Sequence, residues 1–147
     1  MQSPSQVGRA YLLIAEDNPG DVHVIRLALE EQALDYDIQV VTDGEAAMDF
    51  IDAIETGRYT SPGVILLDLN LPRVGGEQVL RRLRQIGGPC ENVPVIIISS
   101  SLSPHDKAIA ETLGAEAYFP KRCDIDQFLQ IGALVKEMLQ FKEKPKA

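Results

Sequence analysis

Short aliphatic runs alternate with helical patterns along most of the chain, and this alternation limits the possible folds more than any other feature. The runs predict strands at 11–15, 38–41, 64–68, 94–99 and 116–119. Apolar residues at helical spacing predict helices over 21–33, 44–57, 75–86, 104–113 and 124–141. Strands that alternate with helices in this way predict a parallel sheet with helices on both faces.

The composition of each strand predicts its place in the sheet. The first, third and fourth runs are largely aliphatic, as central strands covered on both faces are. The run at 38–41 contains the polar Gln39, which favours an edge. These features predict an α/β three-layer sandwich of flavodoxin-like (βα)5 type with strand order 2-1-3-4-5. In such a sheet the functional site lies at the carboxyl ends of the strands.

The length and charge of the chain predict one acidic domain. The 147 residues suit a single domain, which we place at 10–141 between flexible tails at 1–9 and 142–147. The net charge of −8 would repel nucleic-acid phosphates, so we expect no nucleic-acid partner. No apolar run approaches the ~20 residues of a membrane helix, and no signal-peptide pattern is present. We therefore expect a cytoplasmic protein.

The cysteines and histidines predict no site of their own. Cys90 and Cys123 show no CxxC spacing, so we interpret them as reduced thiols. His23 and His105 have no neighbouring ligand residues, so we interpret both as structural or solvent-facing.

Polar side chains stand where the predicted strands end, and they form the candidate site. They are Glu16, Asp17, Asp68, Ser99 and Lys121. Each alone could be a turn, a cap, a strand end or a surface residue. Together they occupy the same point of successive strand–helix units, so we expect them to converge on one pocket.

The chemistry of this pocket favours a metal ion and phosphoryl transfer. Neighbouring carboxylates repel one another unless a positive charge compensates them. Mg²⁺ takes oxygen ligands and commonly binds through carboxylates and a phosphate. Lys121 adds a second positive charge and Ser99 a hydroxyl. Such a site suits transfer of a phosphoryl group to a carboxylate.

Four segments resemble the signatures of the two-component response-regulator receiver domain, over roughly residues 10–140. They are IAEDNPGD at 14–21, LLDLNLPRVGG at 66–76, PVIIISSS at 94–101 and AYFPK at 117–121. EDNPGDVHVIRLALEE and ILLDLNLP further resemble the single-domain regulators of cyanobacterial phytochromes. The resemblance implies a phosphoprotein of phosphorelay signalling that catalyses only its own phosphorylation and dephosphorylation.

The resemblance also implies a role for each acidic residue. Asp68 would accept phosphate from a phosphohistidine on a sensor histidine kinase, which the narrower resemblance suggests is a phytochrome. Asp17 would bind Mg²⁺ directly, and Glu16 directly or through water. Asp68 and the backbone carbonyl of Asn70 would complete the protein ligands, and Mn²⁺ could substitute.

The remaining residues would bind the phosphoryl group and carry the switch. Ser99 and Lys121 would contact the phosphoryl oxygens, and Tyr118 would rotate inward when Ser99 moves. The family usually has a proline after the lysine, joined by a cis bond, whereas this chain has Arg122 there and Pro120 before the lysine. A cis bond without proline costs about 3–4 kcal/mol, so we predict a trans Lys121–Arg122 bond.

The last predicted helix is apolar on more than one side, which bears on assembly. We expect output through protein contacts, because no DNA-binding or catalytic domain follows. A homodimer through the fourth helix, fifth strand and fifth helix would bury residues left partly outside, such as Leu129, Val135, Leu139 and Phe141. The alternative is that these residues fold back over the core.

Three other functions remain open at this point. A receiver-like interaction module could work without phosphorylation, but its usual sign is loss of an acidic residue or the lysine. An aspartyl-phosphate phosphatase or mutase would need DxD at the first strand, whereas Asp68-Leu69-Asn70 follows the third. A flavin carrier would need a hydroxyl- or glycine-rich loop where Glu16 and Asp17 stand.

Overall fold

Five strands and five α-helices alternate along the chain, as the sequence predicts. The computed structural model describes residues 10–34, 36–100, 103–121 and 125–143. The strands are β1 (Tyr11–Ala15), β2 (Asp37–Val41), β3 (Val64–Asp68), β4 (Val95–Ser99) and β5 (Ala117–Pro120). The helices are α1 (Pro19–Glu31), α2 (Gly44–Glu55), α3 (Gly76–Ile86), α4 (Pro104–Thr112) and α5 (Ile125–Glu143). A short 3-10 helix at Gly88–Cys90 was not predicted.

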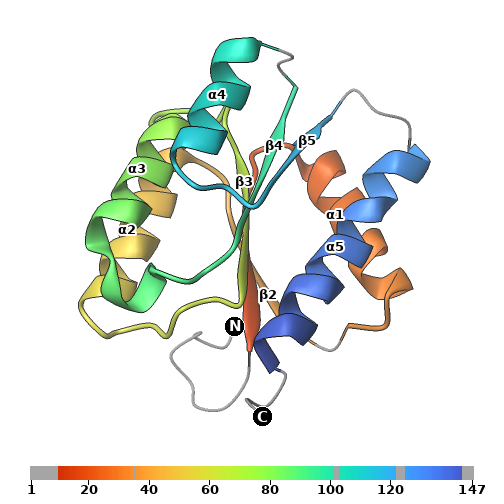
Figure 1. Ribbon diagram of the computed structural model, residues 1–147, viewed down its shortest axis with the longest axis horizontal. Helices are drawn as coiled ribbons and strands as arrows, with labels where there is room; N and C mark the ends of the chain where they lie inside the picture. Colours follow the sequence, from red (N-terminus) through yellow and green to blue (C-terminus); the bar gives the residue numbers. More distant parts are fainter. Residues whose placement is uncertain (1–9, 35, 101–102, 122–124, 144–147) are drawn as a thin grey trace.

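The strands form one parallel sheet in the order β2-β1-β3-β4-β5, which confirms the predicted topology. Helices α1 and α5 cover one face of the sheet, and α2, α3 and α4 cover the other (Figure 1). Residues of β1, β3 and β4 are buried along their whole length, whereas β2 is exposed or half-buried. This difference confirms β2 as an edge strand.

Alternate residues of each strand supply two separate apolar cores. In β1, Leu13 packs toward α2 and α3, and Leu12 packs toward α1 and α5. Successive side chains of a strand point to opposite faces, so a run that is covered on both sides must be apolar throughout. The aliphatic runs of the sequence are explained by this double burial.

The ends of α1 and α2 are set by local backbone chemistry. Helix α1 begins at Pro19, earlier than the predicted start at 21, because Asn18 Oδ1 accepts hydrogen bonds from the N–H groups of Gly20 (2.8 Å) and Asp21 (3.3 Å). Helix α2 ends at Glu55, and Gly57 follows with φ of 80°, a left-handed conformation that favours glycine. The cap places Asp21 in the first turn of α1.

Helix α5 corrects one expectation about exposed apolar residues. Val135 and Leu139 are 0% and 3% exposed, so they are not left partly outside, and the alternative that they pack over the core is confirmed for these two residues. The reason is that α5 packs on both the sheet and α1. At Gly132 the two helices approach so closely that an added Cβ would lie 2.2 Å from the carbonyl oxygen of Ala28. Leu129 is half-buried.

The structure also bears on the predictions for the histidines, the cysteines and membrane-spanning helices. His23 and His105 are exposed to solvent, and Cys90 is buried and forms no disulfide within the described residues. None of the helices in the described ranges has the length and apolar character that a membrane span needs. Cys123, the side chain of Phe141 and the tails at 1–9 and 144–147 lie outside what the structure describes.

Candidate functional site

The register of the sheet brings the candidate residues to one edge. Ala15 of β1 pairs with Leu67 of β3, so Glu16 and Asp68 follow at the same level. Ser99 of β4 pairs with Pro120 of β5, and the N–H of Lys121 donates to the carbonyl of Ser99 at 2.7 Å. The sequence prediction that these strand ends converge is therefore confirmed.

The Lys121 ammonium lies at the centre of the site. Its Nζ is 2.6 Å from Glu16 Oε1, 2.9 Å from Asp68 Oδ2 and 2.9 Å from Asp21 Oδ2. Glu16 and Asp68 are almost fully buried, while the Lys121 side chain is 14% exposed. A buried carboxylate needs a compensating positive charge, and this lysine supplies it to two of them.

Three carboxylates could together hold a metal ion. Glu16, Asp17 and Asp68 each offer an oxygen, and these oxygens lie within 4.8 Å of one another. Glu16 Oε1 is buried and accepts no hydrogen bond of good geometry within the described residues, despite its short contact with Lys121. An all-oxygen set of three carboxylates, two of them buried, fits a hard cation such as Mg²⁺ or Mn²⁺.

The electrostatics of the site follow from burial and pairing. Burial raises the pKa of Glu16 to about 7, although Lys121 and the N–H of Asn18 favour its charged form. Burial alone would lower the pKa of Lys121, but its pairing with Glu16, Asp68 and Asp21 outweighs burial and raises that pKa. The lysine therefore stays charged while it neutralises its acidic neighbours.

Asn70 fixes the orientation of the Asp68 carboxylate. The N–H of Asn70 donates to Asp68 Oδ1 at 2.8 Å, and Lys121 donates to Oδ2 at 2.9 Å. The side-chain amide of Asn70 also donates to the hydroxyls of Ser99 and Ser100, both at 3.3 Å. Ser99 itself is 0% exposed, so its hydroxyl faces the interior of the site rather than bulk water.

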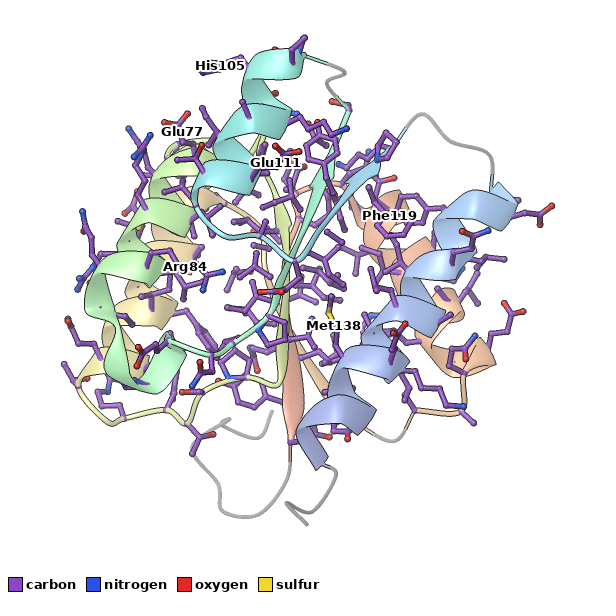
Figure 2. All side chains as sticks on the ribbon, in the orientation of Figure 1. Glu77, Arg84, His105, Glu111, Phe119 and Met138 are labelled. Carbon is purple, nitrogen blue, oxygen red and sulfur yellow. The ribbon has the colours of Figure 1, made fainter. Side chains whose placement is uncertain are left out.

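Tyr118 lies on the edge strand β5, which β4 separates from β3 and Asp68. It pairs in register with Ile97 and is half-buried against the core on the side of α2, α3 and α4. Its neighbour Phe119 packs against the opposite core, toward α1 and α5 (Figure 2). Arg122 lies outside the described residues, so the predicted trans Lys121–Arg122 bond stays a prediction.

Sequence reasoning missed two residues of the site. Asp21 pairs with Lys121, and Asn18 both caps α1 and donates its N–H to Glu16 Oε2 at 3.0 Å. The signal for Asp21 was Pro19, because a proline at the start of a helix places the residues after it in the first turn at the same sheet edge. Because the sequence predicted that the first helix starts at residue 21, Asp21 was not expected to contact Lys121.

Comparison with known proteins shows that the chain is similar to response regulators. The response regulator receiver domain matches residues 12–132. The response regulator Rcp1 of Synechocystis sp. is 30% identical over 113 residues, which is 75% of each chain. The Mn²⁺-bound form of Rcp1 has a TM-score of 0.78 at 28% identity, over 93% of this chain and 99% of that one.

A second solved structure extends this likeness. The phosphorylated cyanobacterial phytochrome response regulator RcpA has a TM-score of 0.78 at 27% identity, over 95% of this chain and all of that one (100%). The resemblance to phytochrome response regulators is thereby confirmed. The matched segment contains β1 from Leu12 onward, all of β2 to β5 and the candidate site. The chain belongs to the response regulator receiver domain family.

Proposed function

We propose that this chain is a response regulator that accepts a phosphoryl group on Asp68 from a sensor histidine kinase, in a Mg²⁺-dependent reaction. The observation that carries the proposal is the oriented Asp68 carboxylate, held between the Asn70 N–H and the Lys121 ammonium beside two further acids. The likeness to Rcp1 and RcpA supports a phytochrome as the kinase.

Each residue of the site would have a separate role in the transfer of the phosphoryl group to Asp68. The P–N bond of the phosphohistidine breaks as an Asp68 oxygen forms the new P–O bond, and the imidazole leaves with the bonding electrons. Lys121 neutralises charge on the phosphoryl oxygens. Glu16, Asp17, Asp68 and the Asn70 carbonyl would hold the Mg²⁺, which supplies further charge neutralisation when it is bound.

The switch would act through Ser99 and Tyr118. A phosphoryl oxygen on Asp68 offers the Ser99 hydroxyl a stronger acceptor than a neutral group, because charge-assisted hydrogen bonds are the stronger ones. Movement of Ser99 toward it would open space for Tyr118, which is half-buried in the neighbouring strand. A local charge change would thus shift a two-state element.

Labelling from acetyl phosphate tests the proposal. We expect incorporation only with Mg²⁺ or Mn²⁺ present, and none at this site in Asp68→Asn. Asp49→Asn is the matched control, because Asp49 is an exposed acid on α2 away from the site. Undiminished labelling of Asp68→Asn would contradict the assignment and favour a module that works without phosphorylation at Asp68.

We further propose that the face formed by α4, β5 and α5 is the output surface and supports a homodimer. Ile125 at the start of α5 is 60% exposed, the most exposed large apolar residue of the described ranges. Sedimentation at micromolar concentration, with and without a phosphate mimic, measures the dimer. Ile125→Lys should weaken it, and Leu27→Lys should not, because Leu27 is 42% exposed but belongs to α1, which is not part of the proposed α4, β5 and α5 surface. A strict monomer in both states would exclude the dimer.

A further inference from the structure

Among the described residues, Asp21 is the one ion-pair partner of Lys121 that belongs neither to the metal cluster nor to the phosphoryl acceptor. The lysine ammonium has three N–H donors, and three carboxylates surround it at 2.6, 2.9 and 2.9 Å. Glu16 and Asp68 both belong to the acidic cluster that could hold a cation. Asp21 comes instead from the first turn of α1.

The three carboxylates differ in what else they must do. Under the proposed function, Glu16 turns to the cation and Asp68 becomes an acyl phosphate, so both interactions with Lys121 weaken during the reaction. Asp21 has no such second role. Its interaction with the ammonium can therefore last through every state of the site.

The position of Asp21 is itself firmly held. Its N–H donates to the Asn18 side chain, which caps α1, while the N–H of Asn18 donates to Glu16. Its side chain is 29% exposed, compared with 14% for Lys121, so the pair lies at the rim of the pocket rather than in its floor. A lysine on a flexible four-carbon stem gains most from such an anchor.

We propose that Asp21 is a positioning residue for Lys121, which holds the ammonium at the rim of the pocket and directs it toward the incoming phosphoryl oxygens. The inference rests on the proposed function. Asp21 contacts no reacting atom, and its effect on phosphorylation passes entirely through the lysine. Preorganisation of this kind accelerates phosphoryl transfer, because the Lys121 ammonium is already in position when the phosphoryl group arrives.

The first test is the rate of Asp68 phosphorylation from acetyl phosphate at saturating Mg²⁺. Asp21→Asn should lower the rate about threefold to tenfold, as expected for loss of one ion pair that solvent partly screens. Asp21→Glu should restore part of the rate. Asp106→Asn is the matched control, because Asp106 is also a half-buried acid in the first turn of a helix, α4. Its rate should equal that of the unaltered chain.

The second test asks whether the effect passes through Lys121. In a Lys121→Met background, Asp21→Asn should cause no further loss of rate, as a double-mutant cycle requires of two residues that act together. An equal loss in both backgrounds would overturn the proposal. Thermal unfolding checks that both Lys121→Met proteins are folded.

The third test needs neither metal nor phosphate. The Lys121 ammonium should give a slowly exchanging ¹⁵N signal in the metal-free chain, and Asp21→Asn should speed its exchange while Asp106→Asn leaves it unchanged. This measurement decides the matter if Lys121→Met does not fold. An unchanged signal and an unchanged rate in Asp21→Asn would overturn the positioning role. Failure of the proposed function would look different, because the unaltered chain itself would then not be labelled.

Discussion

The side-chain amide of Asn70 donates a hydrogen bond to Ser99 Oγ at 3.3 Å and so joins the ends of β3 and β4. The backbone N–H of the same residue holds Asp68 Oδ1 at 2.8 Å. Asn70 thus orients the Asp68 carboxylate through its backbone N–H and binds the Ser99 hydroxyl through its side chain. These two functions can be separated by mutation.

Asn70→Ala should leave Mg²⁺ affinity unchanged to within about twofold, because the proposed ligand is its backbone carbonyl, which alanine retains. The variant should also lose less than about 1.5 kcal/mol of stability, because both neutral hydrogen bonds of the Asn70 amide are long, at 3.3 Å, and the one to Ser100 is exposed. Titration with Mn²⁺ and denaturant unfolding measure both quantities. A tenfold loss of affinity would mean that the side chain itself binds the cation.

Asp17→Ala should weaken metal binding more than Glu16→Ala does. Glu16 shares its charge with Lys121 at 2.6 Å, whereas Asp17 is exposed and belongs to the same acidic cluster. The lysine therefore already neutralises part of the negative charge that Glu16 could offer a cation, so loss of Glu16 costs less binding than loss of Asp17. Isothermal titration of both variants with Mg²⁺ provides the comparison. Equal affinities would contradict the assignment of Asp17 as the direct ligand.

The sequence predicted the sheet because its central strands leave little freedom. Leu12 and Leu13 pack into different cores, so the run around them must be apolar on both faces. Such runs mark central strands, and a polar residue such as Gln39 marks the edge. Once the strand order is known, convergence of Glu16, Asp68 and Lys121 follows from the geometry of parallel strands.

The features that the sequence did not predict are those in which a helix or a side chain contacts two partners at once. Val135 and Leu139 looked partly exposed because a helical pattern does not reveal that α5 packs on both the sheet and α1. Asp21 was not predicted as a site residue, because no local pattern shows that a lysine far along the chain, Lys121, reaches it. Tertiary contacts of this kind are absent from periodicity and from motif spacing alike.

The stability of the metal-free chain should fall as pH rises from about 5 to 7. Burial raises the pKa of Glu16 from 4.5 to about 7, so the folded state binds a proton that the unfolded state has released. This contribution to stability is fully present below 4.5 and is lost as pH rises through about 7. Glu16→Gln carries no such proton and serves as the control.

The quantity that decides this prediction is the difference in unfolding free energy between the unaltered chain and Glu16→Gln. The ionisable groups away from Glu16 are the same in both proteins, so their effects cancel in the difference. Chemical denaturation in the presence of a chelator, at several pH values, measures it. A difference that stays constant between pH 5 and pH 8 would contradict the raised pKa.

Arg84 connects α3 to the end of α4, and its replacement by lysine should loosen that helix. Its Nε donates to the carbonyl of Leu113 at 2.8 Å, and a terminal nitrogen donates to the carbonyl of Gly114 at 2.9 Å (Figure 2). A planar guanidinium can make both bonds at once, whereas an ammonium cannot reproduce this fork. Arg84→Lys should therefore lose about 0.5–1.5 kcal/mol of stability.

The loss should be concentrated in α4, where hydrogen exchange can detect it. The amide of Leu113 bonds to Ile109 and that of Gly114 to Glu111, so both should exchange faster in Arg84→Lys. Arg81→Lys on the same helix is the control, because Arg81 makes an exposed pair with Glu77 that a lysine can also make. If both variants behaved alike, the two bonds from Arg84 would contribute nothing beyond a surface ion pair. A selective effect would identify Arg84 as the residue that fixes the C-terminal end of α4, and so one border of the proposed output face.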